Sequence, residues 1–230
     1  MNAAARKQPK DENPTEALLR SAQEAVTSGV RLSSMASGLA LLMLVGILFL
    51  DIPIWRLDGL AASEGLAPSN WLRVTDVFMA LSVYGVLLAT RRYGAETAGR
   101  AAMLAWAAVV VATTAVVAAL SPQLEPGDMP SARFAAVFSL SWFCGHLVGA
   151  HMFDLARTTL WWRAPLVGAL WAFFLQSGFF FTGQFLGTDV PWPNWMMTDL
   201  MIKGAMAVAF LPIYASLRKS IPPRPGYGGR

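Results

Sequence analysis

The sequence predicts an all-α polytopic integral membrane protein with six transmembrane helices and both termini in the cytoplasm. Composition is the first reason. Of 230 residues, 55% are hydrophobic and only 14% are charged, whereas a soluble domain carries about 25% charged residues. The second reason is a series of apolar runs, each close to the roughly 20 residues that cross a bilayer. The third is an alternation of basic and non-basic loops between those runs.

The apolar runs define six spans in chain order. Lipid offers no hydrogen-bond partners, so each span must bond its backbone groups internally, which makes helices the expected structure. A β-barrel does not fit, because the runs are continuous in apolar character rather than alternating. The predicted spans are Leu32–Leu50, Val74–Thr90, Ala101–Leu120, Ala132–Phe153, Pro165–Gly187 and Met197–Leu217.

Basic residues alternate between the predicted connections. The segments after spans two and four and the tail after span six contain arginines, whereas the segments after spans three and five contain neither Lys nor Arg. Basic loops stay on the cytoplasmic side, so this alternation places both termini there, in agreement with an even number of spans. Arg56 and Arg73, between spans one and two, weaken the contrast slightly. The basic residues on the cytoplasmic side are Arg91, Arg92, Arg100, Arg157, Arg163, Arg218, Lys219, Arg224 and Arg230.

The chain divides into a membrane domain and two tails. Residues 1–31 form a polar cytoplasmic tail, with a short amphipathic helix expected around Thr15–Ala25. Its charged block lies too far before the first apolar run for a typical secretory signal, so that run is expected to be a retained helix. Residues 32–217 form the membrane domain, and residues 218–230 a basic Pro/Gly-rich tail. The single Cys144 excludes an intramolecular disulfide and is interpreted as a packing residue.

A few polar groups inside the spans are candidates for a solute site, because polar groups are expensive at membrane depth. Asp199 and Lys203 are one helical turn apart, so their side chains can meet. They either neutralise each other in a cavity, or Lys203 extends toward the membrane surface. Gln176 and Gln184 lie within about 80° of each other on span five and could share one polar stripe. Bonds to neighbouring helices are the alternative for both. His146 in span four is either pore-facing or a hydrogen-bonded packing residue.

Other function classes find little support. The sequence has no phosphate-binding loop, nucleophile elbow or zinc-protease motif, so no enzyme activity and no cofactor are expected. Two histidines without a cluster of carboxylates do not predict a metal site. The net charge of +4 is explained by cytoplasmic loops, not by nucleic acid. Asp76, near the start of span two, is interpreted as a first-turn acid favoured by the helix dipole.

Four blocks of sequence resemble the VUT family, the queuosine precursor transporters. ATRRYGAETAGRAAMLAW is similar to the family's cytoplasmic basic block, and ARFAAVFSLSWFCGHLVGAHMFDLAR to its fourth helix. WWRAPLVGALWAFFLQSGFFFTGQFLG resembles the family's Trp-Arg segment with FF-x-x-x-F-x-G, and DLMIKGAMAVAFLPIYASL its final D-x-x-x-K helix. The blocks occur in the family's order and cover roughly residues 90–217.

The resemblance implies a six-helix inner-membrane carrier for 7-deazaguanine precursors of queuosine, such as preQ0 and preQ1. Asp199 and Lys203 fall on matched positions, as do three arginines of the basic loops. The chain departs from the family at sites that usually carry acids or polar groups. It has Val86-Leu87 in place of a Thr-Asp pair, His146 and Gly149 in place of Gln and Asp, and Gln176 in place of Asp. These departures point to a different, neutral solute or to a loss of transport.

Two hypotheses follow. The first is a transporter with a solute site between spans four, five and six, where Trp142 or Phe180 stacks on a planar, purine-like solute. Its polar contacts would be His146, Gln176, Gln184, Asp199 and Lys203. The second is a non-transporting accessory or assembly subunit of a larger membrane complex. Beyond the lipid bilayer, the expected partners are therefore a planar solute, a second copy of the chain, or another membrane subunit.

Overall fold

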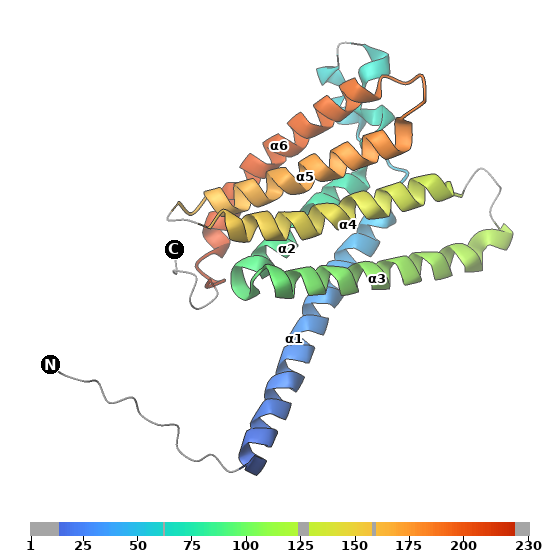
Figure 1. The fold of residues 1–230 in the computed structure, drawn as a ribbon. Helices are drawn as coiled ribbons and strands as arrows, with labels where there is room; N and C mark the ends of the chain where they lie inside the picture. Colours follow the sequence, from blue (N-terminus) through green and yellow to red (C-terminus); the bar gives the residue numbers. More distant parts are fainter. Residues whose placement is uncertain (1–13, 62, 124–128, 158–159, 224–230) are drawn as a thin grey trace.

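The protein is an all-α polytopic membrane protein, described here from a computed structural model that covers residues 14–61, 63–123, 129–157 and 160–223. Within these residues, six helices are long and apolar enough to cross a membrane, as the sequence predicts. Figure 1 shows α3 to α6 stacked side by side, with α1 and α2 crossing them. The six helices are α1 (Pro14–Ile47), α2 (Val74–Tyr93), α3 (Ala95–Leu120), α4 (Ala132–Leu155), α5 (Arg163–Phe185) and α6 (Trp192–Leu217).

Helix α1 begins well before the span that the apolar run predicts. It starts at Pro14 and is continuous to Ile47, so the described part of the expected polar tail is helix. Residues 15–25, TEALLRSAQEA, are rich in strong helix formers, and this explains the extension. The early part of α1 projects away from the other helices (Figure 1) and is exposed there.

Local signals fix the ends of several helices. At the start of α2, the Asp76 carboxylate accepts a hydrogen bond from the backbone N–H of Arg73 at 2.9 Å. This is the first-turn position expected for this acid, where it satisfies a free donor. Ser131 caps α4 by accepting from the Phe134 N–H at 3.1 Å. Gly94, with φ +87°, makes the tight turn between α2 and α3 in a conformation that other residues rarely adopt.

A compact cap joins α1 to α2 and was not predicted from the sequence. It consists of three short 3₁₀ helices, η1 (Trp55–Leu60), η2 (Glu64–Leu66) and η3 (Pro68–Asn70). The Trp195 indole N–H donates to the Gly65 carbonyl at 2.8 Å, which holds the cap on the start of α6, as Figure 1 shows. We call this end of the bundle the cap end.

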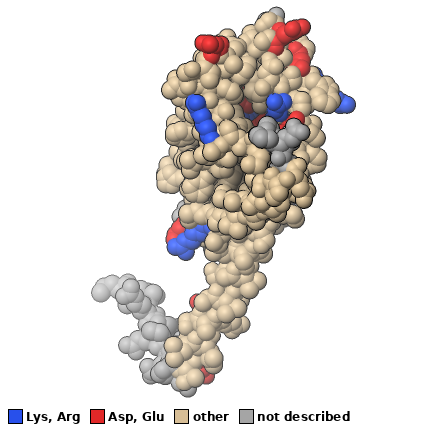
Figure 2. Space-filling model, turned by 90° about the vertical axis from the view of Figure 1, so that its right-hand side faces the viewer, with Lys and Arg blue, Asp and Glu red and all other residues tan. Residues whose placement is uncertain are grey.

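The other end, where Tyr93, Arg157 and Arg218 lie, is called the basic end. The loops after α2 and α4 and the segment after α6 meet there, as the hydrogen bonds from Arg91 to Ile221 and from Arg157 to Thr90 demonstrate. Figure 2 looks mainly onto the cap end, where acidic side chains gather at the top of the molecule. Between the two ends, the outward faces of the helices carry large exposed apolar side chains, such as Val111 and Phe174. This apolar belt is the surface expected to face lipid.

Helices α4 and α5 form the most extensive helix contact, and glycines let them approach. A Cβ built at Gly145 would lie 2.9 Å from the Ala172 carbonyl oxygen, and one at Gly168 would lie 2.9 Å from the Gly149 oxygen. Small residues at such crossings replace the hydrophobic driving force that is missing in lipid with close van der Waals packing. The contact fixes the relative position of Trp142 on α4 and Gln176 on α5.

Candidate functional site

A charged cluster lies in the protein interior between α5 and α6. Lys203 Nζ is 2.7 Å from Asp199 Oδ2 and donates to Gln176 Oε1 at 2.5 Å. The Ser177 hydroxyl donates to the same Asp199 oxygen. All four side chains are buried, and the least buried, Lys203, is only 2% exposed. We call Gln176, Ser177, Asp199 and Lys203 the charged cluster.

The geometry distinguishes between the two sequence-based interpretations of Lys203. The ammonium does not extend to a membrane surface, since it bonds a carboxylate one turn away and an amide on the next helix. Burying two charges costs several kcal/mol per ion, which the mutual attraction offsets only when further hydrogen bonds complete the geometry. Gln176 and Ser177 supply those bonds.

An aromatic face completes the surroundings of the ammonium. Lys203 Nζ lies 5.0 Å from the centre of the Trp142 ring on α4, within the range of a cation–π contact. The Trp142 indole N–H is buried and has no hydrogen-bond partner among the residues that the structure describes. The cluster therefore has a flat aromatic side and one free donor beside its charged pair.

His146 belongs to a neighbouring set of contacts rather than to the charged cluster. It is fully buried, with Nε2 2.7 Å from the Ser82 hydroxyl on α2 and Nδ1 2.6 Å from the Trp142 carbonyl oxygen. A carbonyl oxygen only accepts, so Nδ1 carries a proton in this arrangement. The Trp106 indole lies 3.4 Å from the same Nδ1. His146 thus ties α2, α3 and α4 together and reaches the cluster only through Trp142.

Gln184 is not brought to the cluster. It lies about two turns from Gln176 toward the cap end of α5, and its buried Oε1 has no hydrogen-bond partner within the described part of the chain. Of the five predicted site residues, Gln176, Asp199 and Lys203 converge directly, His146 is adjacent, and Gln184 is separate. Ser177 was not predicted, because nothing in the sequence reveals which hydroxyl of α5 faces α6.

A cavity opens at the cap end, above the cluster. Its volume is about 310 Å³, and we call it the end cavity. Phe138 and Phe180 line it, and each lies one helical turn from a residue around Lys203, namely Trp142 and Gln176. The Trp71 indole N–H and the Thr75 hydroxyl, both from lining residues, are buried without partners. The complete lining is Leu50, Asp51, Asn70, Trp71, Arg73, Thr75, Asp76, Met129, Pro130, Phe134, Phe138, Phe180 and Phe185.

Asp76 connects the end cavity electrostatically with the cluster. One carboxylate oxygen caps α2, and the group also lines the cavity. It interacts with the charges of both Lys203 and Asp199. Among the acids that the structure describes, only Asp199 contacts the Lys203 ammonium directly.

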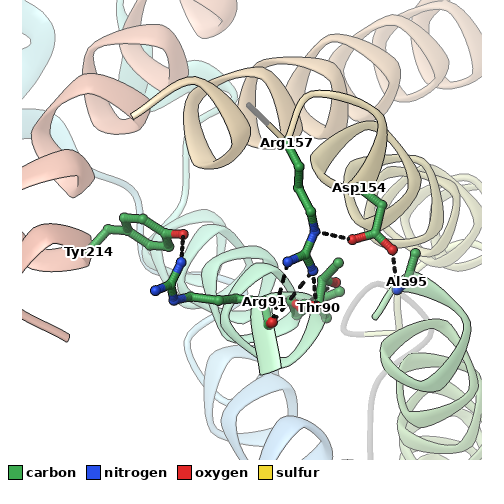
Figure 3. A network of polar contacts seen from close by, with 7 residues as sticks. Thr90, Arg91, Ala95, Asp154, Arg157 and Tyr214 are labelled. Carbon is green, nitrogen blue, oxygen red and sulfur yellow. Dashed lines mark hydrogen bonds and ion pairs between the residues drawn. The ribbon is translucent and has the colours of Figure 1, made fainter. Parts of the chain in front are cut away.

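The basic end is held together by a network of arginines (Figure 3). Arg157 donates to the Thr90 carbonyl at 2.5 Å and bonds Asp154 at 2.6 Å, while the other Asp154 oxygen accepts the Ala95 N–H at 2.7 Å. A cation thus sits at the C-terminal end of α2 and an anion at the N-terminal end of α3, as the helix dipoles favour.

Arg91 extends this network to α6. It donates to the Tyr214 hydroxyl at 3.2 Å and to the Ile221 carbonyl at 2.8 Å. We call Arg91, Asp154, Arg157 and Tyr214 the basic-end network. It joins α2, α3, α4 and α6 on the side of the cluster opposite to the end cavity.

Among the described residues, no three His, Cys, Asp or Glu side chains gather as metal ligands. The charged cluster offers hydrogen-bond donors and acceptors and one aromatic face around a neutral ion pair. Comparison of the chain with protein-family models, with curated proteins and with solved structures gave no match.

Proposed function

We propose that this protein is an inner-membrane carrier for a small, planar, neutral solute of the purine-like class, bound at the charged cluster against Trp142. The observation that carries the proposal is the buried cluster one helical turn below the end cavity. Ionisable groups at membrane depth are costly and are usually kept for function.

The donors and acceptors of the cluster suit the edge of a heterocyclic base. The Asp199 carboxylate accepts hydrogen bonds from amine or ring N–H groups, Lys203 donates to a carbonyl or ring nitrogen, and the Gln176 amide can do both. The Trp142 face offers a stacking surface, and such stacking on a base is worth about 1–3 kcal/mol. The resemblance to queuosine precursor transporters points to the same solute class, the 7-deazaguanines.

Charge balance selects among those solutes. Lys203 neutralises Asp199, and Gln176 carries no charge where the family it resembles usually has an acid. A site of this kind offers no excess negative charge to a cationic side chain, so we expect preference for a neutral base such as preQ0 over the amine-bearing preQ1. A buried cation without a partner would cost several kcal/mol.

Transport would follow alternating access. In the conformation described, the end cavity lies on one side of the cluster and the basic-end network holds the helices together on the other. The loop charges assign the basic end to the cytoplasmic side. Release of the solute there requires Arg91 and Arg157 to break their hydrogen bonds in the basic-end network. No covalent step is involved, and the driving force comes from the solute gradient, the proton gradient or metabolic trapping.

Uptake of labelled preQ0 in cells that lack their own carrier tests this function. Wild-type protein should restore uptake, and Gln176→Ala should abolish it at equal membrane abundance. Met201→Ala on α6 and Phe174→Ala on α5 are matched controls, because both side chains are exposed, at 73% and 55%. Absence of rescue by wild-type protein that is demonstrably inserted rejects the proposed substrate.

One observation favours the accessory-subunit function as a second candidate. The projecting part of α1 exposes Leu18, Leu19, Val26 and Val30, each by at least 65%. A helix face of this kind suits a second copy of the chain or another subunit. Site-specific cross-linking from Leu19 in intact membranes distinguishes the two, since a discrete protein adduct without any uptake activity supports the subunit function.

A further inference from the structure

A second cavity runs along the flank of the bundle, between α1, α3 and α4. Its volume is about 490 Å³, and we call it the lateral groove. It shares Leu50, Met129, Pro130, Phe134 and Phe138 with the end cavity, so the two are adjacent. Its remaining lining residues are Ile47, Thr113, Thr114, Val117, Ala118, Ser121, Ala135 and Ser139.

The lateral groove lies within the membrane-spanning part of the protein. Helices α1, α3 and α4 are three of the six candidate spans, and the hydrophobic stretch of α3 is only 17% buried inside the protein. Apolar cavities stay dry even where they are large enough for water. An empty groove would also forfeit the van der Waals contacts of every atom that lines it. In a bilayer, the hydrocarbon of the surrounding lipid is the material at hand to fill it.

The size of the groove favours a hydrocarbon chain over a protein helix. A helix about 10 Å across occupies roughly 420 Å³ per turn of 5.4 Å. The whole groove would hold about one such turn, whereas a partner helix crossing one leaflet, about 15 Å of hydrocarbon, needs nearly three. A single acyl chain has a much smaller cross-section than a helix, so more of its length fits into the same volume.

The adjoining end cavity supplies a polar place for the head of that acyl chain. Arg73 and Asp51 line the end cavity with opposite charges, and Asn70 lines it too. The buried Trp71 N–H and Thr75 hydroxyl there have no partners, and Trp71 is only 7% exposed. A zwitterionic headgroup is complementary to these groups. Its phosphate can pair with the Arg73 guanidinium and accept N–H and O–H hydrogen bonds, and its ammonium can pair with the Asp51 carboxylate.

We propose that the lateral groove is a specific phospholipid site, which holds one acyl chain between α3 and α4 and places a phosphoethanolamine headgroup in the adjoining end cavity, beside Arg73 and Asp51. The site goes beyond the proposed carrier function and does not depend on it. Lipid contact alone gives no hydrophobic gain over bulk lipid. Selectivity therefore comes from the filled groove and from the headgroup contacts.

Photo-labelling of the purified full chain tests the site. The protein is reconstituted in phosphatidylethanolamine vesicles with a small fraction of phosphatidylethanolamine that carries a diazirine on one acyl chain. Label should concentrate on groove residues such as Val117 and Phe138. Ala135→Trp, which fills the groove, should reduce this labelling at least fivefold. Ala136→Trp is the matched control, since it is equally exposed on the same helix but does not line the groove.

A separate competition measurement tests the headgroup contacts. Unlabelled phosphatidylethanolamine should reduce photo-labelling of the groove more than unlabelled phosphatidylglycerol does. In Arg73→Gln the two lipids should compete equally, while the diazirine on the acyl chain still labels the groove. Label spread evenly over exposed positions such as Val111, or unchanged by Ala135→Trp, would overturn the proposal. So would cross-linking of the groove to a protein instead of lipid. Because labelling is measured on purified protein, its failure is distinguishable from a failure of uptake in cells.

Discussion

Lys203 and Trp142, from helices α6 and α4, meet in the centre of the bundle, with the ammonium 5.0 Å from the centre of the indole ring. The same tryptophan accepts a hydrogen bond from His146 through its backbone carbonyl. Trp142 therefore joins the charged cluster to the contacts that hold α2, α3 and α4. A solute that displaces Lys203 from this ring would act both on the charged cluster and on the contacts that hold α2, α3 and α4. A carrier requires such coupling between solute binding and helix packing.

The first prediction concerns the buried ion pair. Asp199→Leu should lower the free energy of unfolding by about 3–5 kcal/mol, because it leaves Lys203 charged and buried with only an amide partner. The double variant Asp199→Leu/Lys203→Met should lose less than this single variant, since no uncompensated charge remains. Denaturant unfolding in detergent measures both.

The exposed pair Glu96–Arg100 is the matched control, with the same four-residue spacing and side chains 75% and 63% exposed. Its removal should change stability by less than about 1 kcal/mol. If Asp199→Leu changes stability as little as removal of the exposed pair does, burial of the two charges in the cluster is not costly. If the double variant is stable and also transports normally, the pair has no role in solute binding.

The second prediction concerns the stacking face. Trp142→Leu should raise the KM for uptake of the labelled base about fivefold to 160-fold, because stacking of about 1–3 kcal/mol is lost. Trp142→Phe keeps a ring and should raise KM less. Trp171→Leu is the control, since that tryptophan is 42% exposed on α5. A loss of maximal rate at unchanged KM would instead assign Trp142 a role in packing.

Much of the fold follows from simple patterns in the sequence. Apolar runs of sufficient length and alternating loop charge predict the six helices, and the four-residue spacing predicts that Asp199 meets Lys203. The cap between α1 and α2 is different. It rests on short 3₁₀ turns and on the bond from Trp195 to Gly65, and such distant contacts leave no periodic signal in the sequence.

The contacts of the charged cluster are likewise only partly predictable from the sequence. Gln176 and Gln184 face similar directions on α5, yet only Gln176 reaches Lys203, because the height of a residue in the bundle decides its partner as much as its angle does. Ser177 enters the cluster because α5 lies beside α6 at that level. Which helices are neighbours, and at what height, comes from packing such as the glycine contact between α4 and α5, which periodicity does not encode.

The third prediction concerns the basic-end network. Arg157→Gln removes a charged donor from the last carbonyls of α2 and leaves Asp154 without its ion pair. Charge-assisted bonds contribute about 1.5–3 kcal/mol, so local opening should become roughly tenfold more frequent or greater. Hydrogen exchange should then accelerate at the end of α2 and the start of α3. Arg100→Gln, an exposed change nearby, should leave exchange unaltered, and equal rates in the two variants would contradict a closing role for Arg157.

The last prediction concerns the contact between α4 and α5 that positions the site. An alanine Cβ at Gly168 would lie 2.9 Å from the Gly149 oxygen and 2.9 Å from a Leu87 methyl, so Gly168→Ala should destabilise the protein by about 1–3 kcal/mol through overpacking. Gly178 on the same helix has open space around its Cβ, and Gly178→Ala should instead be neutral or stabilise by up to about 1 kcal/mol through helix propensity. Because the separation of α4 and α5 sets the distance between Trp142 and Gln176, Gly168→Ala should also weaken solute binding, whereas Gly178→Ala should not. Unfolding and uptake measured on both variants check this pairing, and equal behaviour of the two glycines would show that close approach of these helices does not hold the site.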